Sequence, residues 1–300
     1  GRGRSPRSPG GTRYARGDRV RHPTQAAWRL GEVLEDSDGT SVRVFFEGAG
    51  EKALGLAYVQ PIKVSGAEAG STLLDNLYLC KHAAGVRFKS LAESIQFFLM
   101  EFPGGFHGER LYKHERKYKE VAHALAKELL EPSVLKALLD GGQHDEICAR
   151  ALKVVNATNL VFPNEKMQLK DGLKRPEHPA KFTTAVVDLL YGDDSYQARF
   201  ERFATMLEEI DSAKWTVATY FSFFVFPAEH MFLKPTVTQQ AAELCGFEIS
   251  YDSKLNWKTY DRLLAFSRWL FDELTKQELQ PRDMIDVQSF IWCIAPGKYD

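Results

Sequence analysis

The sequence predicts an α+β protein built as two domains, a small N-terminal β-barrel followed by an all-α domain. Short runs that alternate apolar and polar side chains fill residues 14–64, which is the pattern of strands. From residue 72 to residue 300 this signal disappears, and apolar side chains recur every three or four positions, as in helices. Residues 65–71 are the expected linker because they are small and lack periodicity, and residues 1–13 are an expected disordered basic tail.

The composition is that of a globular protein with enough apolar material for a core. Hydrophobic residues make up 44% of the chain and charged residues 26%. The richest apolar run, residues 220–227, is far shorter than the roughly 18–20 residues that span a membrane. The amino end has no apolar stretch behind it, so no secretory signal is expected. The scattered cysteines argue against a zinc site or a disulfide framework, and we expect a cytoplasmic, bacterial protein. They are Cys80, Cys148, Cys245 and Cys293.

The net charge of −1 is unevenly distributed along the chain. Residues 1–22 hold seven arginines and one aspartate, so the remainder is mildly acidic. A basic tail on such a body fits contact with nucleic acid, and a plain disordered terminus is the alternative. The isoelectric point of about 6.8 argues against a protein that coats nucleic acid by charge alone.

Four runs predict the strands of the front domain. The first opens with Gly17-Asp18 and closes on Pro23, and an Asp38-Gly39 turn joins the second run to the third. Four or five strands in about 50 residues can only form a small curled barrel. The turn and core residues follow one pattern along the chain: Gly17, Asp18, Val20, His22, Pro23, Gly31, Val33, Val42, Val44, Phe46, Gly50, Lys52 and Leu54.

This pattern resembles the Tudor/SH3-like barrel appended to some DNA-repair helicases. In those helicases the barrel docks on DNA or on other proteins and carries no chemistry. The resemblance therefore implies a protein or DNA partner for residues 14–64. His22 has no companion His or Cys at ligand spacing, so neither a metal nor a catalytic role is expected there.

The helical domain is expected to hold about ten helices, separated by glycine and proline breaks. Apolar faces recur near residues 91–99, 111–129 and 147–155. No internal repeat is present, which disfavours a solenoid. Further helices are predicted at residues 132–140, 163–173, 179–191, 195–209, 213–225, 235–246, 257–276 and 281–294.

Residues 207–246 carry a more specific signal, in the order helix end, tight turn, apolar helix, proline loop, short helix and glycine. The layout resembles the helix-hairpin-helix core of the base-excision DNA glycosylases. Phe232 matches the apolar anchor of that family's catalytic loop. The matching positions on the hairpin side are Leu207, Ile210, Trp215, Thr216 and Ala218, and those on the following helix are Val237, Ala241, Leu244 and Gly246.

Two departures from the family pattern concern its chemistry. The hairpin glycines, whose backbone N–H groups approach a phosphate, are replaced here by residues 211–214. The position of the family's catalytic Asp is occupied by Lys234. If the resemblance holds, the N–H groups of residues 211–214 should face solvent on a basic side.

The resemblance implies cleavage of an N-glycosidic bond, which needs an amine to attack the sugar or a carboxylate to stabilise its cation. Lys234 is the candidate amine if burial lowers its pKa, and a plain surface or phosphate-contacting lysine is the alternative. The candidate carboxylates are Asp211, Asp283 and Glu165, each of which can equally be an acid that caps or begins a helix. We expect one of these carboxylates within about 6 Å of Lys234.

Two basic stretches, residues 110–119 and 166–181, are candidate phosphate contacts, although charge runs on helices are usually solvated faces. Trp215, Phe106 and Tyr112 are candidates for a base pocket, because a flipped base stacks on aromatic rings. An aromatic stripe on the last two helices, which includes Trp292, is expected to be core. The candidate DNA-binding residues are Ser212, Lys214, Arg110, Lys113, Arg116, Lys117, Lys166, Lys170 and Arg175.

These observations favour a DNA glycosylase that flips out and excises a modified base from double-stranded DNA. The missing Asp suggests an unusual base, such as the hydroxymethylated or glucosylated cytosine of phage DNA, in antiviral defence. The alternative is a non-catalytic protein that recognises modified or damaged DNA. No cofactor, metal or membrane partner is expected, and the absence of a His/Asp cluster argues against a metal-dependent nuclease.

Overall fold

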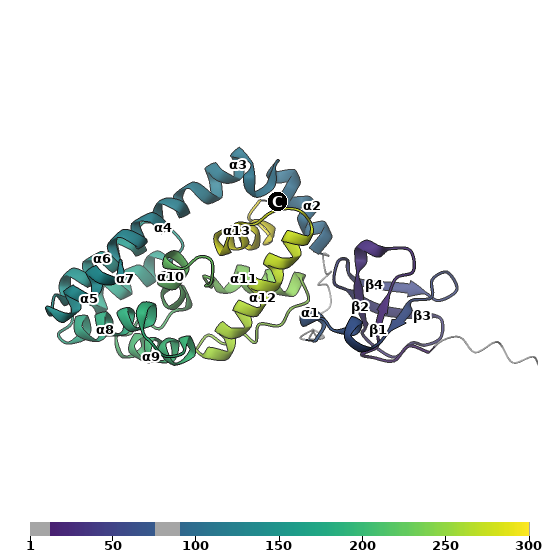
Figure 1. The fold of residues 1–300 in the computed structure, drawn as a ribbon, viewed down its shortest axis with the longest axis horizontal. Helices are drawn as coiled ribbons and strands as arrows, with labels where there is room; N and C mark the ends of the chain where they lie inside the picture. The colour runs from purple at the N-terminus through teal and green to yellow at the C-terminus, as the bar shows by residue number, and fades with distance from the viewer. Residues whose placement is uncertain (1–12, 76–90, 300) are drawn as a thin grey trace, which may run out of the picture. The chain divides into compact units, whose positions relative to one another are not determined.

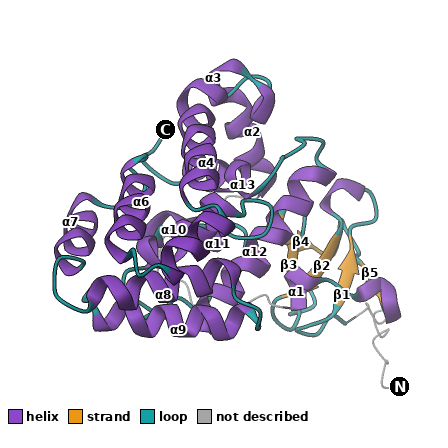
Figure 2. Ribbon diagram, turned by 60° about the vertical axis from the view of Figure 1, so that its left-hand side comes forward, coloured by secondary structure: helices purple, strands orange, loops and turns teal. Residues whose placement is uncertain are grey.

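The computed structural model describes residues 13–75 and 91–299. The tail expected at residues 1–13, apart from Arg13, lies outside these ranges, and so does Cys80. The chain divides into two compact units, one within residues 1–96 with 243–248 and the other within residues 97–242 and 249–300. The α+β class is confirmed, since an antiparallel sheet is followed by helices (Figures 1 and 2).

The first unit holds a five-stranded antiparallel sheet in the order β4-β3-β2-β1-β5. Val20, Val33, Val44 and Phe46 are buried and form its core with their neighbours. A Cβ atom at Gly31 would come within 2.6 Å of the Val44 side chain, so β2 packs there only with glycine. The strands are β1 (Arg19–Arg21), β2 (Leu30–Val33), β3 (Ser41–Phe46), β4 (Gly50–Gly55) and β5 (Ile62–Val64).

The small curled barrel expected from the sequence is a five-stranded antiparallel sheet that is not closed, since β4 and β5 are its two edges. β1 and β5 pair over three residues each, so this end of the sheet is short. The predicted turn at Asp38-Gly39 lies between the antiparallel β2 and β3, with Gly39 at φ +87°. Asp38 accepts the N–H groups of Thr40 and Ser41 at 2.7 and 2.9 Å, which fixes the turn.

Most of the segment expected as a linker, residues 65–71, forms a helical turn. Residues Gly66–Ala69 form a 3₁₀ turn, η2, followed by the short helix α1 (Thr72–Asp75). The guanidinium of Arg19 on β1 donates to the carbonyl of Ala69 at 2.9 Å and to the carboxylate of Asp75 at 2.8 Å. These bonds attach the segment to the sheet.

No strand occurs within residues 110–290, as the periodicity predicts. In the first unit a 3₁₀ turn, η1 (Ala26–Trp28), lies between β1 and β2. Two further turns link helices: η3 (Gly105–His107) and η4 (Tyr112–Arg116), which is a π-helical turn. The helices are α2 (Leu91–Glu101), α3 (Glu109–Leu111), α4 (Lys117–Leu129), α5 (Pro132–Asp140), α6 (His144–Asn156), α7 (Pro163–Gly172), α8 (His178–Tyr191), α9 (Tyr196–Glu209), α10 (Trp215–Val225), α11 (Pro235–Leu244), α12 (Trp257–Lys276) and α13 (Met284–Ile294).

Helix α10 is the centre of the second unit. Every residue of Trp215–Val225 is buried, and the helix packs against α4, α8 and α9 (Figure 2). A helix that is apolar all round must be enclosed by others, which is why this run is a core helix in spite of its strand-like composition. No helix among the described residues is long and apolar enough to cross a membrane.

Candidate active site

Lys234 lies immediately before α11, at the end of a loop that is fixed to the central helix. Phe232 and Leu233 are fully buried. The N–H of Leu233 donates to Thr219 Oγ1 of α10 at 2.9 Å, and that hydroxyl donates to the carbonyl of Trp215 at 2.7 Å. Since Leu233 is held in this way, the core also fixes where the next residue, Lys234, begins its half-buried side chain.

The ammonium of Lys234 rests on two aromatic rings. Its Nζ lies 4.5 Å from the ring centre of Phe162 and 5.3 Å from that of Trp292, within the range of cation–π attraction. The Nζ of Lys298 lies 4.4 Å from the same Trp292 ring. Burial, followed by the positive charge of Lys298, lowers the pKa of Lys234, and the charge of Glu165 partly opposes this. A larger share of the amine is therefore neutral than for a solvated lysine.

Of the three candidate carboxylates, Glu165 is the one whose charge acts on Lys234. It lies in the first turn of α7, and its Oε1 accepts the hydroxyl of Thr216 at 2.6 Å. Asp211 is exposed and pairs with Arg175 at 3.1 Å. Asp283 instead accepts the N–H of Asp286 at the start of α13 and pairs with a buried arginine. Neither Asp211 nor Asp283 is among the charges that act on Lys234.

Beside Lys234 lies a pocket of about 450 Å³, within the second unit. Its walls come from the η4–α4 segment, the loop between α6 and α7, and α13. Tyr118, Gln288 and Trp292 line it, together with the fully buried Lys119. Burial lowers the pKa of Lys119, and its Nζ donates to Ser289 Oγ at 2.9 Å and to Glu115 at 3.3 Å.

The aromatic residues predicted for a base pocket are not the ones that line this pocket. Trp215 is buried, donates its Nε1–H to the carbonyl of Asp252 at 2.7 Å and stacks on Phe200. Phe106 is buried against Phe98, with ring centres 5.0 Å apart. Tyr112 is 43% exposed and lies outside the pocket. None of the three lines the pocket beside Lys234, whereas Trp292, which the sequence placed in the core, does.

Five predicted phosphate contacts are buried or have other partners in the structure. Arg116 is buried in an ion-pair cluster with Glu120, Asp283 and Asp286. Ser212 is buried, and the ammonium of Lys166 donates to the carbonyl of Thr158 at 2.5 Å. Arg110 and Arg175 are exposed but paired with carboxylates. The lysines that remain exposed are Lys113, Lys117, Lys170 and Lys214.

The turn between α9 and α10 uses most of its own backbone donors. Asp211 has φ +58°, and its N–H donates to the carbonyl of Glu208 at 3.1 Å. The N–H of Ser212 donates to Leu207 at 2.8 Å, and that of Lys214 donates to Ser212 at 2.8 Å. The expectation that these three N–H groups face solvent is therefore wrong, and phosphate contact at this turn would depend on the side chain of Lys214.

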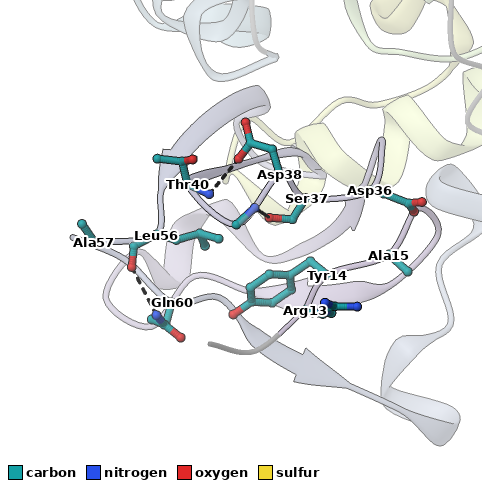
Figure 3. Close-up of a pocket in the computed structure, with 11 residues that line it drawn as sticks. Arg13, Tyr14, Ala15, Asp36, Ser37, Asp38, Thr40, Leu56, Ala57 and Gln60 are labelled. Atoms are coloured by element: carbon teal, nitrogen blue, oxygen red, sulfur yellow. Dashed lines mark hydrogen bonds between the residues drawn. The ribbon is translucent and has the colours of Figure 1, made fainter. Parts of the chain in front are cut away.

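A larger pocket, of about 740 Å³, lies in the first unit beside the β2–β3 turn (Figure 3). Two of its polar side chains bond to backbone carbonyls of the same unit: Tyr14 donates to Pro61 at 2.6 Å, and Gln60 donates to Leu56 at 3.2 Å. Backbone hydrogen bonds lower the pKa of Asp38 there. No group of side chains that could hold a metal ion occurs among residues 13–75 and 91–299.

The loop that carries Lys234 also holds a buried histidine, which makes stability depend on pH. His230 contacts the hydroxyl of Tyr260 at 2.7 Å. Burial, with the charges of Arg199 and Arg268, lowers the pKa of His230 from 6.5 to about 4. The unfolded chain takes up this proton near pH 6.5 and the folded protein only near pH 4, so stability falls as the pH drops between those values.

We expect the free energy of unfolding to fall by roughly 3 kcal/mol across that window on account of His230. Denaturant unfolding at about pH 7 and about pH 4.5 measures this loss. The variant His230→Gln keeps a hydrogen-bonding side chain but cannot titrate. Its free energy of unfolding should therefore fall by much less between the two pH values than that of the wild type. An identical pH dependence in the two proteins would assign the effect to other groups.

Comparison with known proteins gives a family match to the front domain. A family described as "Protein of unknown function (DUF3553)" matches residues 15–64, which include the sheet. No curated protein and no solved structure matches the chain. The reading of the helical domain therefore depends on its own residues.

Proposed function

We propose that the helical domain is a DNA glycosylase that removes a modified base and uses the amine of Lys234. The observation that supports this most is the position of Lys234, which has a lowered pKa and lies at a base-sized pocket with aromatic and amide walls. A volume of about 450 Å³ lies in the range of small-ligand sites. Enzymes that act on a base take it out of the duplex and hold it between apolar and aromatic side chains.

In this proposal the lone pair of Lys234 forms a bond to C1′ of the sugar as the glycosidic bond breaks. The base leaves with the electrons of that bond and takes up a proton. The nitrogen passes one proton to O4′ as the C1′–O4′ bond breaks, which opens the sugar to a protonated imine. Water then hydrolyses this imine to free the lysine and an abasic site. Glu165, fixed by Thr216, is close enough for its charge to act on Lys234 and is suited to accept a proton from the attacking amine.

The proposed substrate and partners follow from the walls of the pocket and from the exposed residues of the two units. The aromatic and amide walls suit a heterocyclic base, and a hydroxymethylated or glucosylated cytosine of phage DNA is the substrate we propose first. The exposed Lys170 of α7 and Lys214 are available for phosphate contacts. The sheet of residues 15–64 would then dock the enzyme on DNA or on a protein partner. A non-catalytic reader of modified DNA is the second candidate, because Lys234 replaces the acid that the resembled family uses.

We expect wild-type protein to release a base from at least one duplex in a panel that carries single modified bases. The panel holds 5-hydroxymethylcytosine, its glucosylated form, 5-hydroxymethyluracil and an oxidised purine, with the unmodified duplex as control. Alkali cleaves the strand at any abasic site, and a denaturing gel displays the fragment. If no duplex is cleaved and one is bound selectively, the reader replaces the enzyme.

A further inference from the structure

Lys298, in the segment 295–299 that follows α13, lies beside the same aromatic ring as Lys234. Its Nζ is 4.4 Å from the ring centre of Trp292, and the Nζ of Lys234 is 5.3 Å from that centre. The two nitrogens are therefore no more than about 10 Å apart, which is about one Debye length at moderate salt. Two ammonium groups this close repel each other. The attraction of each cation to the indole ring keeps both beside Trp292 in spite of their like charge.

The segment that carries Lys298 is attached to the helical domain on both sides of this residue. The hydroxyl of Tyr299 donates to the carboxylate of Glu115, which is itself buried. The ring of Tyr299 packs on that of Phe102, with 4.9 Å between the two centres. The N–H of Lys298 donates to the carbonyl of Ala295 at 3.4 Å, directly after α13. Although the side chain of Lys298 is exposed, its charge therefore stays beside the indole ring.

The charged groups around Lys234 oppose one another. Burial is the largest cause of its lowered pKa, the positive charge of Lys298 lowers it further, and the negative charge of Glu165 raises it. Of the charges that act on Lys234, that of Lys298 is thus the one that favours the neutral amine. Three further titratable side chains line the pocket from η4 and α4 and are not among these causes: Glu115, Tyr118 and Lys119.

We propose that the segment 295–299 is part of the active site and that Lys298 is a positioning residue, which activates the amine of Lys234 through like-charge repulsion beside Trp292. The inference rests on the proposed glycosylase function and adds to it the residue that makes the amine reactive. Only the neutral amine has the lone pair that attacks C1′ of the sugar. A neighbouring cation favours that form, as it does for other lysines that form imines.

The first test is the pH dependence of single-turnover base release from the duplex that the panel identifies. The rate should rise with pH as Lys234 loses its proton. Lys298→Gln should move this rise to higher pH by about half a unit, which is roughly a threefold loss below the midpoint and none above it. Lys298→Arg keeps the charge and should keep the wild-type midpoint. Lys136→Gln, which removes an exposed lysine of α5, is the matched control and should leave the midpoint unchanged.

A phosphate contact is the other role that an exposed lysine can have, and the same profile tests it. Loss of a phosphate contact weakens DNA binding without changing the proton equilibrium of Lys234. A loss of equal size at every pH in Lys298→Gln would therefore make Lys298 a phosphate contact and would overturn the proposal. Repulsion between the two amines also weakens with salt, so the shift of the midpoint should shrink as the ionic strength is raised.

A second measurement separates this inference from the proposed function, because it uses the protein without DNA. The lysines are reductively methylated with isotope-labelled formaldehyde, and the NMR signal of Lys234 is followed against pH. The signal is assigned by its absence in Lys234→Arg. The pKa of Lys234 should rise by about half a unit in Lys298→Gln and keep its wild-type value in Lys298→Arg.

The two measurements together distinguish failure of the inference from failure of the function. If no duplex loses a base and the pKa of Lys234 rises in Lys298→Gln, the action of Lys298 on Lys234 stands and the glycosylase fails. If bases are released and neither the midpoint nor the pKa moves in that variant, the inference is overturned and the glycosylase stands. Absence of both base release and a pKa change overturns both.

Discussion

Replacing Lys234 by alanine should lower single-turnover base release by on the order of 100-fold or more and should abolish the covalent adduct that borohydride traps with wild-type protein. The reason is the position of the amine. Its pKa is lowered by burial and by Lys298, and the aromatic rings of Phe162 and Trp292 hold it at the pocket. A reductant converts the imine between this nitrogen and the sugar into a stable amine bond, which a denaturing protein gel detects as a shifted band.

The matched control for this experiment is Lys136→Ala. Lys136 lies on α5, is exposed and does not line the pocket, so its loss should leave the adduct intact. Circular dichroism of both variants confirms that the helices persist. An adduct that survives in Lys234→Ala would assign the chemistry to another amine. Base release without any adduct in the wild type, lost in Glu165→Gln, would instead indicate that a carboxylate stabilises the sugar cation.

The helices could be predicted closely because their signals are local. The predicted helix at residues 257–276 coincides with α12, whose start is fixed by Asn256 accepting the N–H of Thr259 at 2.8 Å. The last helix was expected from residue 281 and begins at Met284, because Asp283 caps it. Pro281 indicated approximately where the helix starts, and the capping carboxylate of Asp283 sets the first helical residue at Met284.

Closure of the sheet could not be predicted in this way. The alternation within residues 14–64 reveals strands, but whether the edge strands β4 and β5 pair depends on how the chain curls, which no local pattern records. The family match to residues 15–64 covers the same stretch and carries no functional description.

The sequence pointed to Lys234 as a candidate but not to the residues that surround it. Lys234 could be found because its place between a proline loop and a helix start is a local feature. Its neighbours could not be found, since Tyr118 and Gln288 come from segments far apart in the chain. Glu165 was one of three equivalent acids until the fold brought its charge near Lys234.

The basic stretch at residues 110–119 shows that a charged run can be buried where the sequence suggests an exposed face. A run of charges on a helix suggests a solvated or DNA-binding face. Here the π turn η4 is part of the segment, and Glu115, Arg116 and Lys119 are buried. The partners that make burial of Arg116 possible, Asp283 and Asp286, lie more than 160 residues further along the chain.

Those partners form a buried charge cluster whose disruption should be the largest stability effect in the helical domain. Asp286 has no exposed surface, and its carboxylate accepts from Arg116 at 2.8 Å and from Arg282 at 3.0 Å. Arg116 in turn contacts Asp283 at 3.0 Å and Glu120 at 2.7 Å. The cluster joins η4 to the first turn of α13. Further along, α13 also carries Gln288 and Trp292 of the pocket.

The variant Asp286→Ala should destabilise the protein by about 3–5 kcal/mol, because it leaves a buried arginine without its most enclosed partner. Arg116 cannot escape by losing its proton, since a guanidinium stays charged at any ordinary pH. Denaturant unfolding followed by helical circular dichroism measures the change, and Glu146→Ala is the matched control. Glu146 also pairs with an arginine, Arg150, at 3.0 Å, but its side chain is 51% exposed, so its loss should cost at most about 1 kcal/mol. Equal effects from the two variants would mean that Asp283 and Glu120 alone satisfy Arg116, and that the cluster does not hold α13 against η4.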